Sequence, residues 1–439
     1  MGGARLVRLQ TRRLLSSVSG AGLTFAARVD RLLTPQRMRI YPAIFVILGL
    51  ASLVINVAMG HIPLTLSGQP LTPDYLAHWT GGKLLLKGDM GHLYDPSVQL
   101  ELQRGVIGGS TSLSWFVSPP FTAVLYAPLA LLPYPLSAGV WIVSSTAMLV
   151  GALALLRPML PRLSRQNWGL VILVLAASQP VFELIGSGQD SALSVLLWVS
   201  GIKLLTQERD WAAGVVFALG LFKPQLFILA PVVLLLQHRI RALGAWAVTT
   251  SGLALASAAL VGPAGIKSWL SLPFTHLYQA QVQEGQASKM QGLPSLLVTL
   301  FPTEISGIAQ IVGLVIAIVL VAGFVLAVRS APAPSINEVW AFAALTTVLA
   351  SPHLVIYDLV LAVPAFLYLL EWHDQRVTRL SLLLLFAITW TTAIRHVAAQ
   401  QLPWPLAVVG GAWSAVPLFV LWALQYRNLR PFRAPQNQA

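Results

Sequence analysis

Long apolar runs recur along the chain from residue 44 to the C-terminal region, and short polar segments separate them. A helix that crosses the hydrocarbon core of a membrane needs about 20 mostly apolar residues. The pattern therefore predicts an all-α polytopic membrane protein with about twelve crossings. The expected crossings are residues 42–60, 134–156, 168–184, 191–206, 211–222, 225–237, 243–261, 306–328, 338–350, 357–370, 379–395 and 405–425.

Two parts of this pattern predict broken elements. Residues 116–133 are apolar but contain Pro119, Pro120, Pro128 and Pro133, and proline removes a backbone hydrogen-bond donor. We expect a broken or re-entrant segment there. Residues 211–222 and 225–237 are too short to cross separately at about 1.5 Å per residue. Because Lys223-Pro224 joins them, we expect a bent pair of helices.

Two long polar segments, 61–115 and 262–305, are expected as loops on the outer side of the membrane. Residues 76–87 mix leucine, tryptophan and lysine, which predicts an amphipathic helix lying on the outer surface. The second loop is rich in glutamine. Its amide groups can bind sugar hydroxyls, but a solvated loop would have the same composition. The expected organisation is one membrane domain, 42–426, between a cytoplasmic arm, 1–41, and a cytoplasmic tail, 427–439.

Composition and charge agree with a membrane protein. The chain has 439 residues, of which 56% are hydrophobic and 10% charged, whereas soluble domains carry roughly 25% charged residues. The absence of cysteine excludes disulfides, a thiolate nucleophile and cysteine-ligated metals.

The net charge of +13 indicates membrane orientation rather than nucleic-acid binding. Eight arginines and one acid, Asp30, precede the first crossing, which places the N-terminus in the cytoplasm by the positive-inside rule. With twelve crossings the C-terminus lies on the same side. The arginine-rich residues 6–15 fit a helix on the inner membrane surface, or a mitochondrial transit peptide.

With this orientation, the unusual polar groups fall at the outer ends of the apolar runs. An ionisable residue near membrane depth is costly and indicates a functional site by default. We therefore expect a site at the outer face. Its candidate residues are Asp74, Tyr75, Trp79, Gln189, Lys223, Gln225, His353, Tyr357, Asp358, Arg395 and His396.

Asp74 and His353 are the candidate catalytic residues. Asp74 can act as a general base that takes the proton of an acceptor hydroxyl group, or it can simply begin a turn or cap a helix after Pro73. His353 can orient Asp74, share its charge or bind a phosphate, or it can form a hydrogen bond at a helix end. A histidine without a Glu-x-x-His pattern is a poor metal site, so no metal is expected.

The other candidates are substrate-binding groups with structural alternatives. Lys223 and Arg395 can bind a lipid phosphate or extend towards the membrane interface. Gln189 and Gln225 can bind sugar hydroxyls or phosphate, or can link neighbouring helices. The sequence has no P-loop and no dinucleotide fingerprint, so no nucleotide cofactor is expected, and an activated donor at the outer face would be lipid-linked.

The ordered motifs resemble glycosyltransferase family 87. They are Asp74-Tyr75 with Trp79, Leu93-Tyr94-Asp95-Pro96, Ser118-Pro119-Pro120-Phe121, Gly188-Gln189, Lys223-Pro224-Gln225, and Ser351-Pro352-His353 with Tyr357-Asp358. The resemblance implies a GT-C-type enzyme of the bacterial plasma membrane with its active site facing outward. It implies inverting transfer of a hexose, typically mannose, from a polyprenyl-phosphate donor to a glycolipid or glycan acceptor.

In this resemblance the first-loop acid of the family corresponds to Asp74, which becomes the general base, and the histidine of its Ser-Pro-His motif corresponds to His353. Asp190 departs from the pattern, because asparagine is expected there more often.

Two other readings of the sequence remain open. A lipid-linked glycan transporter or flippase would also contain broken helices, but we find no internal repeat, and the polar groups gather at one face rather than at the midplane. A glycan ligase or polymerase acting on undecaprenyl diphosphate would call for more outward-facing arginines.

Overall fold

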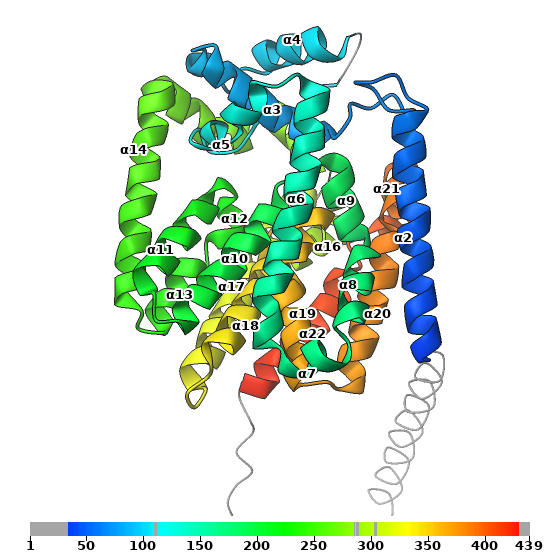
Figure 1. Ribbon diagram of the computed structural model, residues 1–439, viewed down its shortest axis with the longest axis vertical. Coiled ribbons are helices and arrows are strands. Elements are labelled where there is room, and N and C mark those ends of the chain that lie inside the picture. Colours follow the sequence, from blue (N-terminus) through cyan, green and yellow to red (C-terminus); the bar gives the residue numbers. More distant parts are fainter. Residues whose placement is uncertain (1–33, 109–111, 285, 287–288, 303–304, 430–439) are drawn as a thin grey trace, which may run out of the picture.

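The computed structural model describes residues 34–108, 112–284, 286, 289–302 and 305–429. Throughout this part of the chain the regular elements are helices, and strand pairing is limited to isolated bridges, which confirms the all-α prediction. Figure 1 shows a helical bundle and, above it, a smaller layer that we call the cap. The cap consists of α3 (Pro73–Leu86), α4 (Pro96–Ile107) and α5 (Thr122–Ala130).

Three long helices connect the two parts, two along opposite sides of the view in Figure 1 and the third through its middle. They are α2 (Pro35–Ala58), α6 (Tyr134–Leu156) and α14 (Ile240–Ser271). At Gly262, α14 has a non-helical backbone with φ of 67°, and it then continues to Ser271. The expected loop 262–305 therefore begins at this break and continues as helix to Ser271.

The cap is built around α3. A Cβ atom at Gly82 would lie 2.7 Å from the backbone of Tyr126, so glycine allows α3 to pack closely on α5. Leu76, Trp79 and Leu84 are all buried. The helix expected at residues 76–87 is therefore present, and α4 and α5 pack against it. Its position along the outer membrane surface stays a prediction.

The bundle has an aromatic core. Trp340 of α18 (Ile336–Ala350) stacks on Phe217 of α11 (Asp210–Leu219), with the ring centroids 4.1 Å apart. Trp198 of α10 (Ser191–Thr206) meets both rings edge to face. The other bundle helices are α7 (Pro161–Gln166), α13 (Ala230–Leu236), α16 (Leu293–Leu300), α17 (Ser306–Ser330), α19 (Val363–Trp372) and α22 (Ala415–Leu429).

Fewer helices are long enough to cross a membrane than the sequence pattern suggests. Among the described residues, four are long and apolar enough: Pro35–Ala58, Tyr134–Met159, Ile240–Phe274 and Ser306–Ser330. Two bent pairs raise the number to six, and they are α8–α9 (Trp168–Ala176 and Gln179–Ser187, 56°) and α20–α21 (Arg376–Trp390 and Thr392–Gln401, 58°). The twelve expected crossings are not confirmed.

Several of the expected crossings form helices that are too short to span a membrane alone. At about 1.5 Å per residue, the seven residues of α13 and the ten of α11 are too short to span alone. The nine residues of α5 are also too short, in agreement with a broken segment at 116–133. The predicted break at Lys223 is confirmed, between η3 (Gly220–Phe222) and α12 (Pro224–Phe227).

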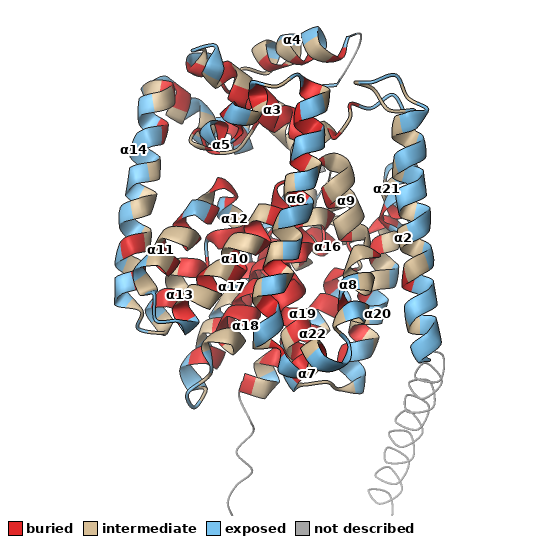
Figure 2. Cartoon of the chain, in the orientation of Figure 1, coloured by how far each residue is buried: buried red, intermediate tan, exposed pale blue. Residues whose placement is uncertain are grey.

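The outer helices expose apolar side chains, which indicates a membrane protein. Figure 2 shows exposed residues along α2 and α14 and buried residues in α3, α18 and α19. Only 6% of the apolar window of α2 is buried inside the protein. These surfaces have no partner within the described chain and are suited to lipid.

The connections that carry arginines gather at the end opposite the cap. These are α7, the turn before α14, and the loops that join α17 to α18 and α19 to α20 (Figure 1). The assignment of that end to the cytoplasm stays a prediction, as do the domain boundaries. The expected surface helix at residues 6–15 and most of the tail lie outside the described residues.

Candidate functional site

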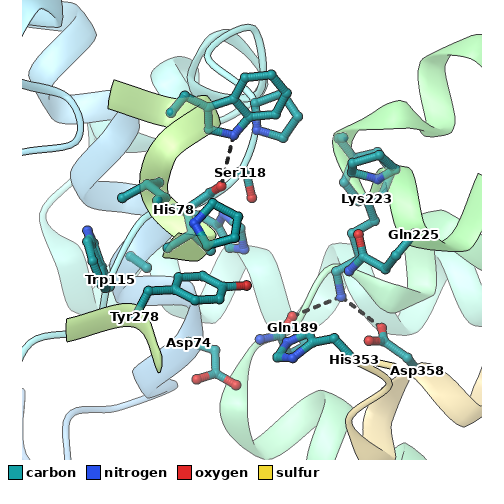
Figure 3. A pocket seen from close by; sticks show the side chains of 18 of the residues that line it. Asp74, His78, Trp115, Ser118, Gln189, Lys223, Gln225, Tyr278, His353 and Asp358 are labelled. Carbon is teal, nitrogen blue, oxygen red and sulfur yellow. Dashed lines mark hydrogen bonds and ion pairs between the residues drawn. The ribbon is translucent and has the colours of Figure 1, made fainter. Parts of the chain in front are cut away.

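A cavity of about 400 Å³ lies between the cap and the bundle (Figure 3). Its walls come from α3 and the segment 114–119, from the end of α14 through Tyr278, and from the bundle. Its volume falls within the range of small-ligand pockets. Seven of the predicted site residues line it: Asp74, Gln189, Lys223, Gln225, His353, Tyr357 and Asp358.

Asp74 lies in the first turn of α3, directly after Pro73, and its side chain is partly buried at the cavity. Within the described part of the chain, no hydrogen bond or ion pair holds its carboxylate, and the start of α3 has no side-chain cap. Asp74 is therefore not used as a helix cap, and its oxygens are free to meet a ligand.

Lys223 lies at the centre of a buried polar group that we call the Lys223 cluster. It consists of Lys223, Gln189, Asp190, Ser191 and Asp358. The Lys223 Nζ lies 2.8 Å from Oδ1 of Asp190 and 2.8 Å from Oδ1 of Asp358. It also donates to Gln189 Oε1 at 3.1 Å and Ser191 Oγ at 3.0 Å. Figure 3 shows Lys223 joined to Gln189 and Asp358 by these bonds.

Further contacts fix both carboxylates of the cluster. Ser191 donates to Asp358 at 2.5 Å, and Tyr126 from the cap donates to Asp190 at 3.2 Å. The cluster thus ties α5, α10, α12 and η8 (Ile356–Ala362) together. A buried ion pair is costly to form, and loss of one partner leaves an uncompensated charge. In this cluster two carboxylates face one ammonium, so the charge of Lys223 is already neutralised.

Gly188 allows this arrangement to form next to α3. It ends α9 with φ of 73°, a left-handed conformation that glycine adopts without steric cost. A Cβ atom there would lie 2.7 Å from the Cβ atoms of both Thr72 and Tyr75. Glycine therefore lets the segment that carries Gln189 and Asp190 approach the beginning of α3.

His353 lies in a segment that neighbouring elements hold firmly. The Gln291 backbone N–H donates to the carbonyl of Leu354 at 2.8 Å, and Ser295 Oγ donates to that of Pro352 at 3.2 Å. Nδ1 of His353 is buried and has no hydrogen-bond partner among the described residues. Burial lowers the pKa of His353, although Asp358 opposes the shift. A neutral imidazole is therefore expected at the cavity wall.

Two predicted site residues of α3 lie outside the cavity lining. Tyr75 is fully buried, shares a hydrogen bond of 2.5 Å with Ser137 and stacks on Trp141. Trp79 donates to the carbonyl of Leu132 at 3.3 Å. Both side chains pack α3 against α6 and the end of α5. The structure therefore shows a packing role for them and does not bring them to the cavity.

Arg395 and His396, at the bend between α20 and α21, are also outside the lining. The guanidinium of Arg395 donates to Thr391 and Thr392, each at 3.1 Å, and to the carbonyl of Gly411. Arg395 also donates to the carbonyl of Ile388 at 3.4 Å, so its guanidinium links the bend to the segment at Gly411. The structure does not bring Arg395 or His396 together with Asp74 at the cavity.

The lining residues that were missed in the sequence include His78, Trp115 and Tyr278. His78 had a signal, because it follows Asp74 by four residues and so lies on the same face of a helix. Trp115 and Tyr278 had none, since they meet only in space, with ring centroids 6.2 Å apart. Gln291 of the glutamine-rich segment is fully buried and accepts a hydrogen bond from Ser414.

Metal-ligand side chains are dispersed. The described residues contain no group of three or more histidines, aspartates or glutamates that could hold a metal ion. The expectations that the protein needs no metal and no cofactor stay predictions.

The fold and the cavity define a helical membrane protein with a partly buried, unpaired acid facing a cluster of buried charges. The model of glycosyltransferase family 87 matches residues 116–352, which is more than half of the chain, and the chain belongs to this family. It is therefore a glycosyltransferase, of the GT-C type that the resemblance implies. No curated protein and no solved structure matches it.

The family match begins after α3 and ends one residue before His353. It covers Gln189, Lys223 and Gln225 but neither candidate catalytic residue. The roles of Asp74 and His353 therefore rest on geometry and on the motif resemblance.

Proposed function

We propose that this protein transfers a hexose from a polyprenyl-phosphate donor to a hydroxyl group of a glycolipid or glycan, with inversion and with Asp74 as general base. Mannose is the proposed hexose, in line with the family resemblance. The proposed location is the outer face of a bacterial plasma membrane. The observation that carries the proposal is the unpaired Asp74 carboxylate at a cavity in a member of a glycosyltransferase family.

The chemistry requires one base and one stabilised leaving group. The acceptor oxygen attacks the anomeric carbon while Asp74 takes the hydroxyl proton, and the bond from that carbon to the phosphate oxygen breaks. The electron pair leaves with the polyprenyl phosphate. A carboxylate must reach the proton directly or through one water. Among the described residues no other side chain occupies the oxygens of Asp74, which supports this role.

We assign the leaving phosphate to the side of the cavity that carries His353. Hydrogen-bond donors aimed at developing charge can lower the barrier substantially. Lys223 contributes there less than a free cation would, because Asp190 and Asp358 already bind it. His353 has an unpartnered ring nitrogen at the lining and is the better placed of the two.

The remaining lining residues suit a hydroxylated substrate. Gln189 and Gln225 present amides to the cavity, and Trp115 and Tyr278 present aromatic rings from the cap side. Amides can bond sugar hydroxyls, and rings can pack on the apolar face of a sugar. Tyr357 and Asp358 line the opposite wall, next to Lys223.

The test is mass spectrometry of envelope lipids and glycans from a deletion strain complemented with wild type or Asp74→Asn. We expect one species to lose a hexose in the deletion strain, and the wild type alone to restore it. Restoration by Asp74→Asn would remove the proposed base. An unchanged glycan profile in the deletion strain, where the wild type is expressed, would contradict the transfer itself.

A further inference from the structure

His78 is the buried titratable group at the cavity that the proposed reaction does not use. It lies on α3, four residues after Asp74, so the two side chains share one face of the helix, with Cβ atoms about 5–6 Å apart. Only 7% of His78 is exposed, and the residue lines the cavity.

Three neighbours fix the orientation of the His78 ring. Tyr126 stacks on it with centroids 4.5 Å apart and planes 14° apart. Phe116 meets it edge to face at 6.0 Å. The Nε2 atom faces Oδ2 of Asp190 at 3.5 Å, and Tyr126 donates to the same oxygen.

The two ring nitrogens of His78 therefore differ in environment. A carboxylate beside Nε2 favours the tautomer that carries its proton on Nε2. Burial lowers the pKa of His78, with Asp190 opposing the shift, so the ring is expected to be neutral at neutral pH. In that state Nδ1 is a hydrogen-bond acceptor. It is buried and has no partner in the described part of the chain.

We propose that Nδ1 of His78 accepts a hydrogen bond from a hydroxyl group of a sugar substrate. An acceptor nitrogen requires a ligand atom that carries hydrogen, which hydroxyl groups supply and fully ionised phosphate and ether oxygens do not. A buried acceptor left without a partner is costly. A ligand that supplies the missing donor is therefore recognised in preference to one that lacks it.

This inference rests on the proposed function, and the hydroxyl has two possible sources, the transferred hexose and the acceptor. The Asp190 contact links recognition to the Lys223 cluster, because one carboxylate faces His78 and Lys223 at the same time. His78 is thus a candidate specificity residue. The Asp190 carboxylate that faces it also binds Lys223 on the opposite wall.

The test uses full-length protein in lipid nanodiscs and glycolipid extract of the deletion strain as acceptor. The donors are polyprenyl-phosphate mannose and its 2-, 3-, 4- and 6-deoxy analogues. If the hydroxyl belongs to the hexose, one analogue should lose about 10- to 100-fold in kcat/KM with the wild type. In His78→Gln, whose amide can still reach Asp190, the same analogue and the parent donor should differ by less than about 3-fold.

The acceptor source gives a different pattern. His78→Gln should then raise the KM for the extract about 10-fold, with the KM for the donor and all deoxy penalties unchanged. His78→Asn, which places an oxygen near the position of Nδ1, should recover part of the loss in either case.

Two results would overturn the inference. The first is a His78→Gln variant that folds, transfers mannose, and keeps every deoxy penalty and both KM values of the wild type. His78→Phe, which retains the stack on Tyr126, replaces His78→Gln if that variant unfolds. The second is a wild type that transfers no mannose at all, which would overturn the proposed function as well.

Discussion

The two walls of the cavity hold their carboxylates in opposite states. On the α3 wall, the partly buried Asp74 has no hydrogen bond or ion pair within the described residues. On the bundle side, Asp358, which lines the cavity, and Asp190, which does not, are nearly inaccessible to solvent, and both lie 2.8 Å from the Lys223 ammonium. A carboxylate whose oxygens are occupied stabilises structure, whereas a free one can accept a proton from substrate. We therefore assign the proposed chemistry to Asp74 and a structural role to Asp190 and Asp358.

The two cations near the apolar boundary also differ in the partners that bind them. Lys223 lies at the cavity but is neutralised by two acids. Arg395 has neutral partners, but these are hydroxyls and carbonyls at a helix bend away from the cavity. The sequence predicted the same phosphate-binding role for both residues, because each is a cation near the end of an apolar run. Only their partners in the folded protein distinguish them.

Among variants that test this comparison, Lys223→Met is expected to have the largest effect on stability. It leaves two buried carboxylates without their cation, which should lower the free energy of unfolding by about 3–5 kcal/mol. Denaturation of the purified protein in detergent measures this change. The matched control is Lys203→Met on α10, where no ion pair is formed, with an expected change within about 0.5 kcal/mol. Equal stability of the two variants would contradict a structural role for Lys223.

A smaller loss is expected from Gly188→Ala. The added Cβ would meet Thr72 and Tyr75 at 2.7 Å, at a residue with φ of 73°. The strain should cost about 1–3 kcal/mol and displace the segment that carries Gln189 and Asp190, so transfer should fall as well. Gly139→Ala on α6 is the control, because open space surrounds its Cβ position. A Gly188→Ala variant with the stability and rate of that control would show that the close approach is unnecessary.

The smallest effect on transfer is expected from Arg395→Gln. A residue outside the cavity makes no contact that strengthens in the transition state, so kcat/KM per folded molecule should stay within about 2-fold of wild type. Stability should fall, because the carbonyls of Ile388 and Gly411 lose the guanidinium that donates to them. A more than tenfold loss of kcat/KM with intact folding would instead place Arg395 on the substrate path.

The sequence predicted the features that depend on local chemistry. Proline placed the break at Lys223 and the interruption of residues 116–133, because its missing donor acts on its own helix. The motif order identified the family and seven residues of the cavity lining. The twelve crossings are not confirmed, because α11, α13 and α18 are apolar but short and pack among other helices, and composition does not distinguish this from packing against lipid.

The polar partners could not be predicted because they are distant in sequence. Lys223 and Asp358 are separated by 135 residues, and nothing local in either segment indicates the pair. Asp190 was noted only as a departure from the expected asparagine, yet it binds Lys223 and faces His78. His78 was within reach of sequence reasoning, because a spacing of four on a helix places it beside Asp74.

The most direct test of the central claim compares Asp74→Asn with Asp190→Asn in one transfer assay, using polyprenyl-phosphate mannose and measuring thermal unfolding of each protein. If Asp74 is the general base, Asp74→Asn should keep the stability of the wild type and lose transfer by about 10²- to 10⁴-fold. Asp190→Asn should lose stability and keep a rate per folded molecule within about tenfold of wild type. A folded Asp74→Asn protein that transfers mannose at the wild-type rate would contradict the account.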